Sequence, residues 1–246
     1  MLLLAFDTAT PRISVALHDG ARVIAEASAD DPRRHGELLA PFIATVLAEA
    51  AQPATAITGI VTGVGPGPYT GLRVGVVTAR VMGEALQVPA HGVCTLDVIA
   101  YEAAVIQRSV PPGTPFVVAT DARRKEVYWG RYDPDGERIS GPDVSRPADV
   151  PAGPAAGQGA WLYAESFGEP AEPRFPSASV LATLAARRLG DGAHPRRPAK
   201  RASQRAAASE ERSGGGRREI LLAPEPLYLR HPDARQPGPP KAVTPR

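Results

Sequence analysis

The first part of the chain alternates apolar and polar positions in the way expected of strands that share one sheet. Residues Leu2–Phe6 are continuously apolar, which is typical of a buried strand, and Ile13–His18 alternate, which is typical of a half-buried one. The dipeptide Asp19-Gly20 favours a hairpin turn, and Arg22–Ala27 is expected to form the returning strand. Further along, the apolar run Ile57–Val64 predicts another buried strand.

Two helices are predicted on either side of that last strand. The first carries an apolar stripe that repeats every four residues, formed by Leu38, Leu39, Phe42, Ile43, Val46, Leu47 and Ala50. Pro41 falls inside this stripe, so it is expected to kink the helix or to lie in its first turn. Residues Thr70–Leu86 predict the second helix.

The second helix carries small residues on one face, at Gly71, Gly75, Ala79 and Gly83. Glycine inside a helix costs up to about 1 kcal/mol relative to alanine, so such a stripe indicates that another backbone approaches closely. Packing on the chain's own sheet and contact with a partner chain are both open interpretations of this face.

The second half of the chain begins with the same pattern as the first. Residues Phe116–Thr120 are followed by Asp121, as Leu2–Phe6 are followed by Asp7. An alternating segment and a second Asp-Gly dipeptide come next, as in the first half. The repeat predicts an α/β fold built from two related β-β-β-α-β-α units, the second of them eroded by Pro/Gly/Ala-rich sequence after Gly141.

Composition and charge divide the chain further. The expected parts are residues 1–101 as the N-terminal unit, 102–190 plus 219–232 as a smaller C-terminal unit, 191–218 as a disordered basic insertion, and 233–246 as a disordered tail. From Gly192 to Arg218 there are eight basic and two acidic residues, which leaves −4 on the rest of a chain with net charge +2. A solvated linker and a weak contact with RNA are the two interpretations of this insertion.

Two global properties restrict the class of protein. A single cysteine, Cys94, excludes an internal disulfide and a thiolate metal cluster. No apolar run approaches the roughly 20 residues of a membrane-spanning helix, and the N-terminus lacks the pattern of a signal peptide. A cytoplasmic protein without membrane contact is therefore expected.

The segment Gly65–Gly75 joins a predicted strand to a predicted helix through a Gly/Pro-rich turn, a layout that can present backbone N–H groups to a phosphate. The common nucleotide motifs are missing. Candidate phosphate-proximal residues are Asp7, Thr8, Gly65, Gly67 and Thr70. The alternatives are a purely structural turn and, for Asp7, an aspartate that organises its own turn.

No set of residues has the spacing of a catalytic or metal site. His35 would need a second histidine four residues later on the same helix face, and Leu39 stands there. Cys94 has no recognisable base partner. The charged loop Asp121–Glu126 is either a solvated turn or part of the lining of a cleft between the two units. We expect no catalytic residue and no metal.

Five segments together resemble one family. They are Asp7-Thr8-Ala9-Thr10, His35 with Leu38-Leu39-Ala40-Pro41, Gly65-Pro66-Gly67-Pro68-Tyr69-Thr70-Gly71-Leu72-Arg73-Val74-Gly75, Asp121-Ala122-Arg123 with Glu126-Val127-Tyr128, and Pro226-Leu227-Tyr228-Leu229-Arg230. These segments are similar to those of the TsaB (YeaZ) family. The resemblance is dense from residue 1 to about 133, thin to about 190, absent across the basic insertion, and present again at 226–230.

The resemblance implies the ribonuclease H-like fold of the actin/Hsp70/sugar-kinase superfamily and a role in bacterial tRNA modification. The family's partner TsaD carries the metal site and transfers a threonylcarbamoyl group to the adenosine beside the anticodon, while TsaE is an ATPase. A TsaB-type chain would be the non-catalytic subunit, reaching tRNA through the complex. Homodimers are also implied. No cofactor is certain, and ATP or ADP at or near the partner interface is the one candidate.

The resemblance places the partner interface on the two N-terminal helices. The residues it implicates are His35, Leu38, Leu39, Phe42, Gly71, Arg73, Gly75, Ala79 and Gly83. The chain departs from the family at Pro68, where serine is usual, and this removes a hydroxyl and an N–H from the turn. An ATP-dependent phosphotransferase of the same fold is the alternative function, and a peptidase has no nucleophile or metal motif to support it.

Overall fold

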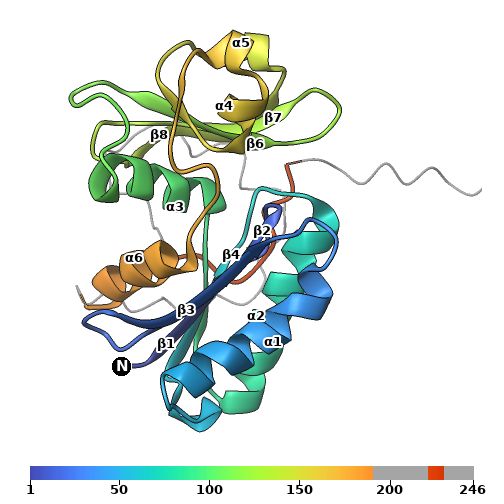
Figure 1. Cartoon of the computed structure of the whole chain (residues 1–246), viewed down its shortest axis with the longest axis vertical. Coiled ribbons are helices and arrows are strands. Elements are labelled where there is room, and N and C mark those ends of the chain that lie inside the picture. Colours follow the sequence, from blue (N-terminus) through green and yellow to red (C-terminus); the bar gives the residue numbers. More distant parts are fainter. Residues whose placement is uncertain (191–220, 230–246) are drawn as a thin grey trace, which may run out of the picture.

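The computed structural model describes residues 1–190 and 221–229, which form two mixed β-sheets with helices on and between them (Figure 1). The strand order is β3-β2-β1-β4-β5 in the first sheet and β8-β7-β6-β9-β10 in the second. The two orders match strand for strand along the chain. The predicted duplicated α/β fold is therefore confirmed.

The elements follow the predicted segments closely in the first half. The first sheet comprises β1 (Leu3–Asp7), β2 (Arg12–His18), β3 (Val23–Asp30), β4 (Gly59–Gly63) and β5 (Ala90–Val93). Its helices are α1 (His35–Glu49), α2 (Tyr69–Leu86) and α3 (Thr95–Tyr101), the last continued by the π-helical turn η2 (Glu102–Ile106). A 3-10 turn, η1 (Ala54–Ala56), precedes β4. Pro41 lies inside α1 and not in its first turn.

The second repeat is reduced, as its sequence predicts. Its strands are β6 (Phe116–Asp121), β7 (Val127–Tyr132), β8 (Arg138–Ser145) and the two-residue β9 (Ala155–Ala156) and β10 (Pro170–Ala171). Short elements cover it, namely η3 (Pro147–Asp149), α4 (Gln158–Leu162) and α5 (Ala164–Phe167), and α6 (Ala178–Gly190) follows. The two short strands stand where the first repeat has β4 and β5, so the erosion affects the later half of the unit.

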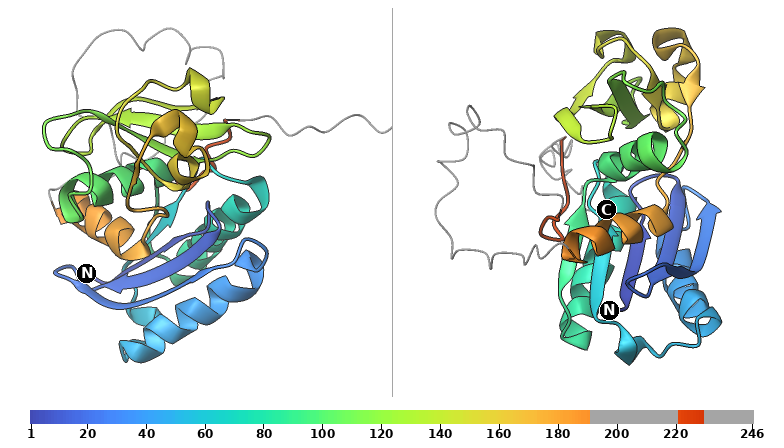
Figure 2. Two further views of the ribbon diagram at one scale, coloured as in Figure 1. Left: turned by 45° about the horizontal axis from the view of Figure 1, so that its top comes forward. Right: turned by 90° about the vertical axis from the view of Figure 1, so that its left-hand side faces the viewer.

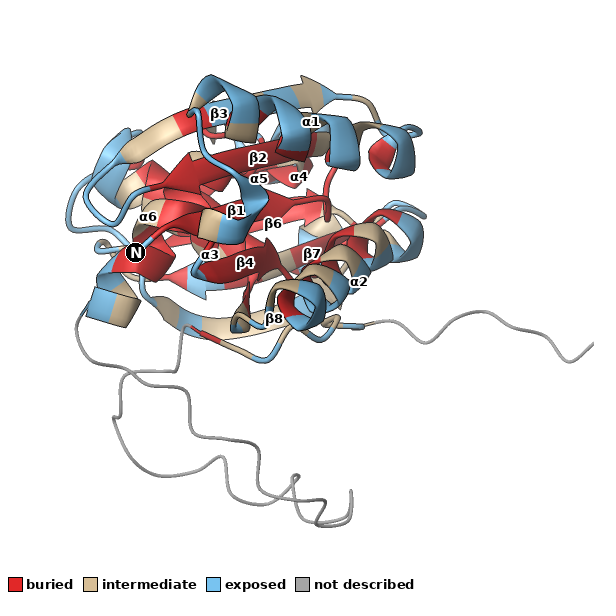
Figure 3. Ribbon diagram, turned by 90° about the horizontal axis from the view of Figure 1, so that it is seen from below, coloured by how far each residue is buried: buried red, intermediate tan, exposed pale blue. Residues whose placement is uncertain are grey.

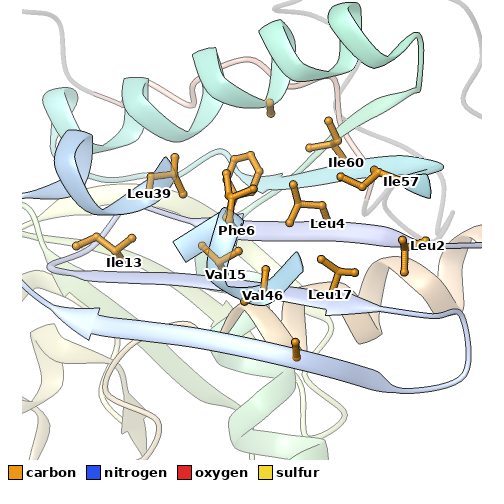
Figure 4. Close-up of a cluster of buried hydrophobic side chains, with 13 residues drawn as sticks. Leu2, Leu4, Phe6, Ile13, Val15, Leu17, Leu39, Val46, Ile57 and Ile60 are labelled. Carbon is orange, nitrogen blue, oxygen red and sulfur yellow. The ribbon is translucent and has the colours of Figure 1, made fainter. Parts of the chain in front are cut away.

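The main hydrophobic core lies between the first sheet and the helices α1 and α2 (Figure 4). Leu4 and Phe6 of β1 project into it, and Leu39 and Val46 of α1 close it from outside. All four are at most 2 % exposed, and burying a side chain of this kind contributes about 1.5–3 kcal/mol. The large side chains of Leu4 and Phe6 thus form the face of β1 on which α1 and α2 pack.

The opposite face of the first sheet is covered by α6, which corrects one part of the expected domain division. Residues 178–190 were expected to belong to the smaller unit, yet Val180, Leu181 and Leu184 pack with Ala5 and Val61 of the first sheet. Small side chains on that face of the strands leave room for a helix to approach. The views in Figure 2 show α3 and α6 between the two sheets.

The later residues also join the first sheet. Leu222 pairs with Gly92 of β5, and the Leu227 amide donates to the carbonyl of Val64 at 2.8 Å. This part of the predicted 219–232 segment therefore lies against the N-terminal unit. The predicted insertion 191–218 and tail 233–246 lie outside the described residues.

The small-residue stripe of α2 faces the chain's own sheet. All four of its residues are buried. The hydroxyl of Thr8 donates to the Gly71 carbonyl at 2.8 Å and accepts from the Gly75 amide at 3.0 Å. These are two groups that pair with each other in a regular helix, so the Thr8 side chain inserts into the helical ladder. A Cβ at Gly71 would lie 2.5 Å from the Thr8 carbonyl oxygen, and one at Gly75 would lie 2.5 Å from Thr8 Oγ1.

Asp7 sits at the end of β1 and is fully buried. Its Oδ1 accepts from the Ala9 amide at 2.7 Å, and its Oδ2 accepts from the Thr95 hydroxyl at the start of α3 at 2.8 Å. Asp121 makes the same turn in the second repeat, where its Oδ1 accepts from the Arg123 amide at 2.8 Å. Burial raises the pKa of Asp7 from 3.8 to about 6, because the two hydrogen bonds offset desolvation only in part.

We expect Gly75→Ala to destabilise the fold by roughly 1–3 kcal/mol, because the added methyl overlaps the Thr8 hydroxyl. Gly36→Ala in α1 is the matched control, since a Cβ there has nothing within 4 Å, and it should stabilise by up to about 1 kcal/mol. Urea denaturation measures both. Equal effects at the two positions would contradict the close approach of α2 to the sheet.

We expect Asp7→Asn to change stability in a pH-dependent way. The folded pKa of about 6 lies above the ordinary 3.8, so the carboxyl favours folding in its protonated form and loses that contribution as pH rises from about 4 to about 6. Asparagine has no such dependence. Relative to the wild type, the variant should therefore gain up to about 3 kcal/mol between pH 4 and pH 7. Denaturant unfolding at both pH values tests this, and a constant difference would refute it.

Candidate functional site

A pocket of about 220 Å³ opens where the loops of the two repeats meet the first turns of α1 and α2. Thr8 and Thr10 reach it from the loop after β1, Arg33 from the loop before α1, Thr70 from the start of α2, and Arg123 from the loop after β6. Both repeats thus contribute a loop to one site. Each of these loops follows the first strand of its repeat and begins with the same aspartate turn.

The pocket suits a small anion. No aspartate or glutamate is among its lining residues, whereas two arginines are. Arg123 is paired with Asp121 at 3.2 Å, which holds it in its loop. The first turn of α2 adds backbone N–H groups without intrahelical acceptors. Pro68 is the N-cap residue of α2 and forms no side-chain cap, so the usual capping hydroxyl is missing there.

The five phosphate-proximal candidates divide into two groups. Thr8 and Thr70 line the pocket. Asp7 is buried behind it with both oxygens hydrogen-bonded, and Gly65 is bound to Thr95 through its amide at 3.2 Å and its carbonyl at 2.8 Å. A Cβ on Gly67 would lie 2.1 Å from the Ala9 carbonyl oxygen, so that glycine serves the packing of the turn. For Asp7, the structure favours the interpretation of an aspartate that organises its turn.

Sequence reasoning found some of the charged groups of the pocket and missed another. Arg123 belongs to the loop for which lining a cleft was one of two interpretations, and it does line the pocket. Arg33 was not among the candidates, because sequence spacing does not show whether a loop arginine lies near residues that are far away in the chain. His35 does not face a metal partner, since its Nε2 lies 2.7 Å from the Thr10 carbonyl oxygen.

The outer sides of α1 and α2 are exposed or half-buried (Figure 3), and we call the apolar residues on them the docking face. Val77 is 52 % exposed and Val81 is 61 % exposed, one turn apart on α2. Four further apolar side chains of these helices are half-buried and pack against the core, namely Leu38, Phe42, Val74 and Met82. Exposed apolar side chains that gather on one face are a feature of protein interaction sites.

Five of the expected interface residues are buried in the chain's own fold. Gly71, Gly75, Ala79 and Gly83 pack against its sheet, and Leu39 lies in the core. Leu38 and Phe42 remain partly exposed on α1. Val77 and Val81, which were not among the expected residues, are exposed apolar side chains of α2. Their four-residue spacing on the opposite side of α2 was the available signal.

An aromatic cluster extends the surface at the start of α2. The Arg73 guanidinium lies 4.8 Å above the Tyr69 ring and donates to the Tyr69 hydroxyl at 2.7 Å. The ring of Tyr228 stacks on Tyr69 with centroids 5.2 Å apart. The segment 226–229 therefore returns to the same end of α2, and the exposed Arg73 keeps a position open to a partner.

Other chemistry has little support among residues 1–190 and 221–229. Within them, no group of three or more His, Cys, Asp or Glu side chains is placed to hold a metal ion. Burial raises the pKa of the Cys94 thiol well above its ordinary value, which disfavours the nucleophilic thiolate. In the same residues, no helix combines the length and the hydropathy needed to cross a membrane.

Comparisons with known proteins agree with this geometry. The family model described as TsaD, tRNA N6-adenosine threonylcarbamoyltransferase, matches residues 23–193. An uncharacterized protein of Mycobacterium tuberculosis is 44% identical over 184 residues, which is 73% of this chain and 82% of that protein. The tRNA threonylcarbamoyladenosine biosynthesis protein TsaB of Escherichia coli is 35% identical over 139 residues, which is 56% of this chain and 58% of that protein.

A solved structure extends the likeness to the whole fold. YeaZ from Pseudomonas aeruginosa superposes with a TM-score of 0.67 at 31% sequence identity, covering 78% of this chain and 93% of that one. The match takes in nearly the complete length of the known structure. The chain therefore belongs to the TsaB (YeaZ) family, within the wider group that the threonylcarbamoyltransferase model matches.

Proposed function

We propose that this chain is a non-catalytic scaffold subunit in the biosynthesis of N6-threonylcarbamoyladenosine in tRNA. The observation that carries the proposal is the docking face, where Val77 and Val81 stand exposed in an apolar surface of α1 and α2. The names of the TsaB relatives indicate the pathway, the biosynthesis of threonylcarbamoyladenosine in tRNA. The catalytic partner is a TsaD-type subunit with its own metal site, an ATPase of the TsaE type assists it, and tRNA binds to the complex.

A homodimer through the same face is part of the proposal. In a twofold-symmetric dimer, the same surface of each subunit contacts the same surface of the other. The docking face can therefore bind either a second copy of this chain or a related partner. The two assemblies then compete for Val77 and Val81, and the relative concentrations of the chains decide which forms.

The alternative of an ATP-dependent phosphotransferase receives no support from the site. A phosphotransferase needs a carboxylate that can reach a metal ion or a water near the phosphates. Asp7 has no exposed surface, and both of its oxygens accept hydrogen bonds within the fold. The second repeat offers Asp121, which is paired with Arg123.

We also propose that the anion pocket takes the phosphates of ATP or ADP. Two arginines, the exposed hydroxyl of Thr70 and the start of α2 are each weak anion sites, and their combination supports phosphate binding. A volume of about 220 Å³ is below the roughly 300 Å³ of pockets that enclose a whole small molecule, so the nucleoside would lie outside. His35 and Gly36 of α1 line the pocket, which puts the nucleoside beside the docking face.

The docking face is tested by Val81→Glu, alone and with Val77→Glu. A charge in the middle of an apolar interface is left unpaired, so co-purification with a TsaD subunit should be lost. Ile139→Glu is the matched control, since Ile139 is 46 % exposed on β8 of the second sheet. In a separate assay of tRNA modification, the chain without TsaD should form no modified adenosine. Modification without TsaD would contradict the scaffold role, and intact binding by both valine variants would contradict the interface.

The anion pocket is tested by Arg33→Gln in the assembled complex. A lost hydrogen bond to a charged group costs about 1.5 kcal/mol or more, so ADP binding should weaken by about tenfold. Arg22→Gln is the control, because Arg22 is exposed in the turn between β2 and β3, away from both the pocket and α2. Calorimetric titration measures both. Equal ADP affinities for the two variants would contradict nucleotide binding in this pocket, and the scaffold proposal would be unaffected.

A further inference from the structure

A second cavity, of about 460 Å³, lies on the opposite face of the first sheet from the docking face. Its walls are the edge strand β3 and its neighbour β2, the π-helical turn η2 and the first residues of α6. Figure 1 shows α6 beside these strands and on the other side of the sheet from α1 and α2. Neither the anion pocket nor the docking face shares a lining residue with it.

Two side chains in the lining carry buried oxygens without hydrogen-bond partners. Ser14 on β2 is 3% exposed, and its Oγ has no partner among the described residues. Glu102 on η2 is 9% exposed; its Oε1 accepts from the Gln107 side chain at 2.8 Å, and its Oε2 is also without a partner there. An unsatisfied buried polar group costs about 1–3 kcal/mol, and more when charged. Two of them at one cavity point to a ligand that completes them.

Arg12 and the start of α6 line one part of the cavity. Arg12 is held in place by a bidentate pair with Asp30, at 2.7 and 3.1 Å, and by the ring of Phe175, 5.1 Å from its guanidinium carbon. The start of α6 brings Ser177 and Ser179 to the same cavity. The first backbone N–H groups of this 13-residue helix have no intrahelical acceptors and favour a negative group.

The cavity has a negative end. Glu102 is joined by Glu26, which is exposed on β3 at the mouth. Burial raises the pKa of Glu102 above its ordinary value, while the Gln107 hydrogen bond and the charge of Arg12 act in the opposite direction. A cationic group of a ligand would hold this carboxylate in its ionised form and would partner the open Oε2.

We propose that this cavity binds a small zwitterion of the α-amino-acid class. The ligand ammonium lies on Glu102 and Glu26, and the ligand carboxylate lies at the start of α6 beside Arg12 and Ser14. A neutral sugar or polyol fits less well, because it leaves the charge of Glu102 uncompensated. A metal ion fits less well, because the lining holds only two carboxylates, Glu26 and Glu102, and the cationic Arg12 lines the same cavity. The Ser28 and Ser177 hydroxyls then contact the side chain of the bound amino acid.

The full-length chain should be titrated with each of the twenty standard amino acids. Backbone amide chemical shifts and calorimetry measure binding during each titration. At least one should bind saturably and shift the amides of Ser14, Ser28 and Ser177–Ser179. The amine and the carboxylic acid that correspond to the best ligand, each lacking one charged group, should bind at least tenfold more weakly. Absence of saturation for the whole panel would overturn the proposal, as would equal binding of the amine or the acid.

Two variants test the assignment of the groups. Glu102→Gln keeps the shape and removes the charge, so amino-acid binding should weaken at least tenfold, with Glu49→Gln on the exposed side of α1 as the control. Ser14→Ala, on the opposite wall, should weaken binding too and remains informative if Glu102→Gln does not fold. Unchanged binding by a folded Glu102→Gln, or shifts confined to the anion pocket, would refute the site.

Discussion

The hydroxyl of Thr8 between the Gly71 carbonyl and the Gly75 amide is the contact on which the arrangement of the first unit depends. It allows α2 to approach the end of β1 more closely than a helix with side chains on that face could. The small-residue stripe exists for this approach, and the same contact leaves the valine side of α2 turned outward. A side chain in the first loop thus determines which face of α2 is available to a partner.

The buried aspartate turn fixes the relation between the strand ends and α3. Asp7 binds Thr95 at the start of α3, and Thr95 in turn accepts from the Gly65 amide. At the other side of α3, Asp97 accepts from the Tyr132 hydroxyl at 2.8 Å and lies 3.3 Å from Arg138. One short helix therefore connects the first sheet to the second through buried polar contacts. This connection brings the strand-end loops of the two repeats together around the anion pocket.

The two faces of the first sheet are chemically different. The face under α1 and α2 is apolar throughout the core and continues into the apolar docking face. The face under α6 is apolar only near β1 and β4, and it becomes polar at the edge, where Arg12, Ser14 and Glu26 stand on β2 and β3. An assembly through α1 and α2 leaves the second cavity uncovered. The proposed amino-acid site and the proposed docking face can therefore operate in the same molecule.

The sequence alone determined the duplicated α/β order, the boundaries of most strands, the two N-terminal helices and the reduced second unit, because periodicity and turn residues report local structure. It could not determine which side of α2 is buried, since a stripe of small residues suits a sheet and a partner equally. Nor could it place α6 on the first sheet or bring Arg33 to Arg123. These depend on contacts between distant segments, where the free energy of packing, and not the local pattern, selects the arrangement.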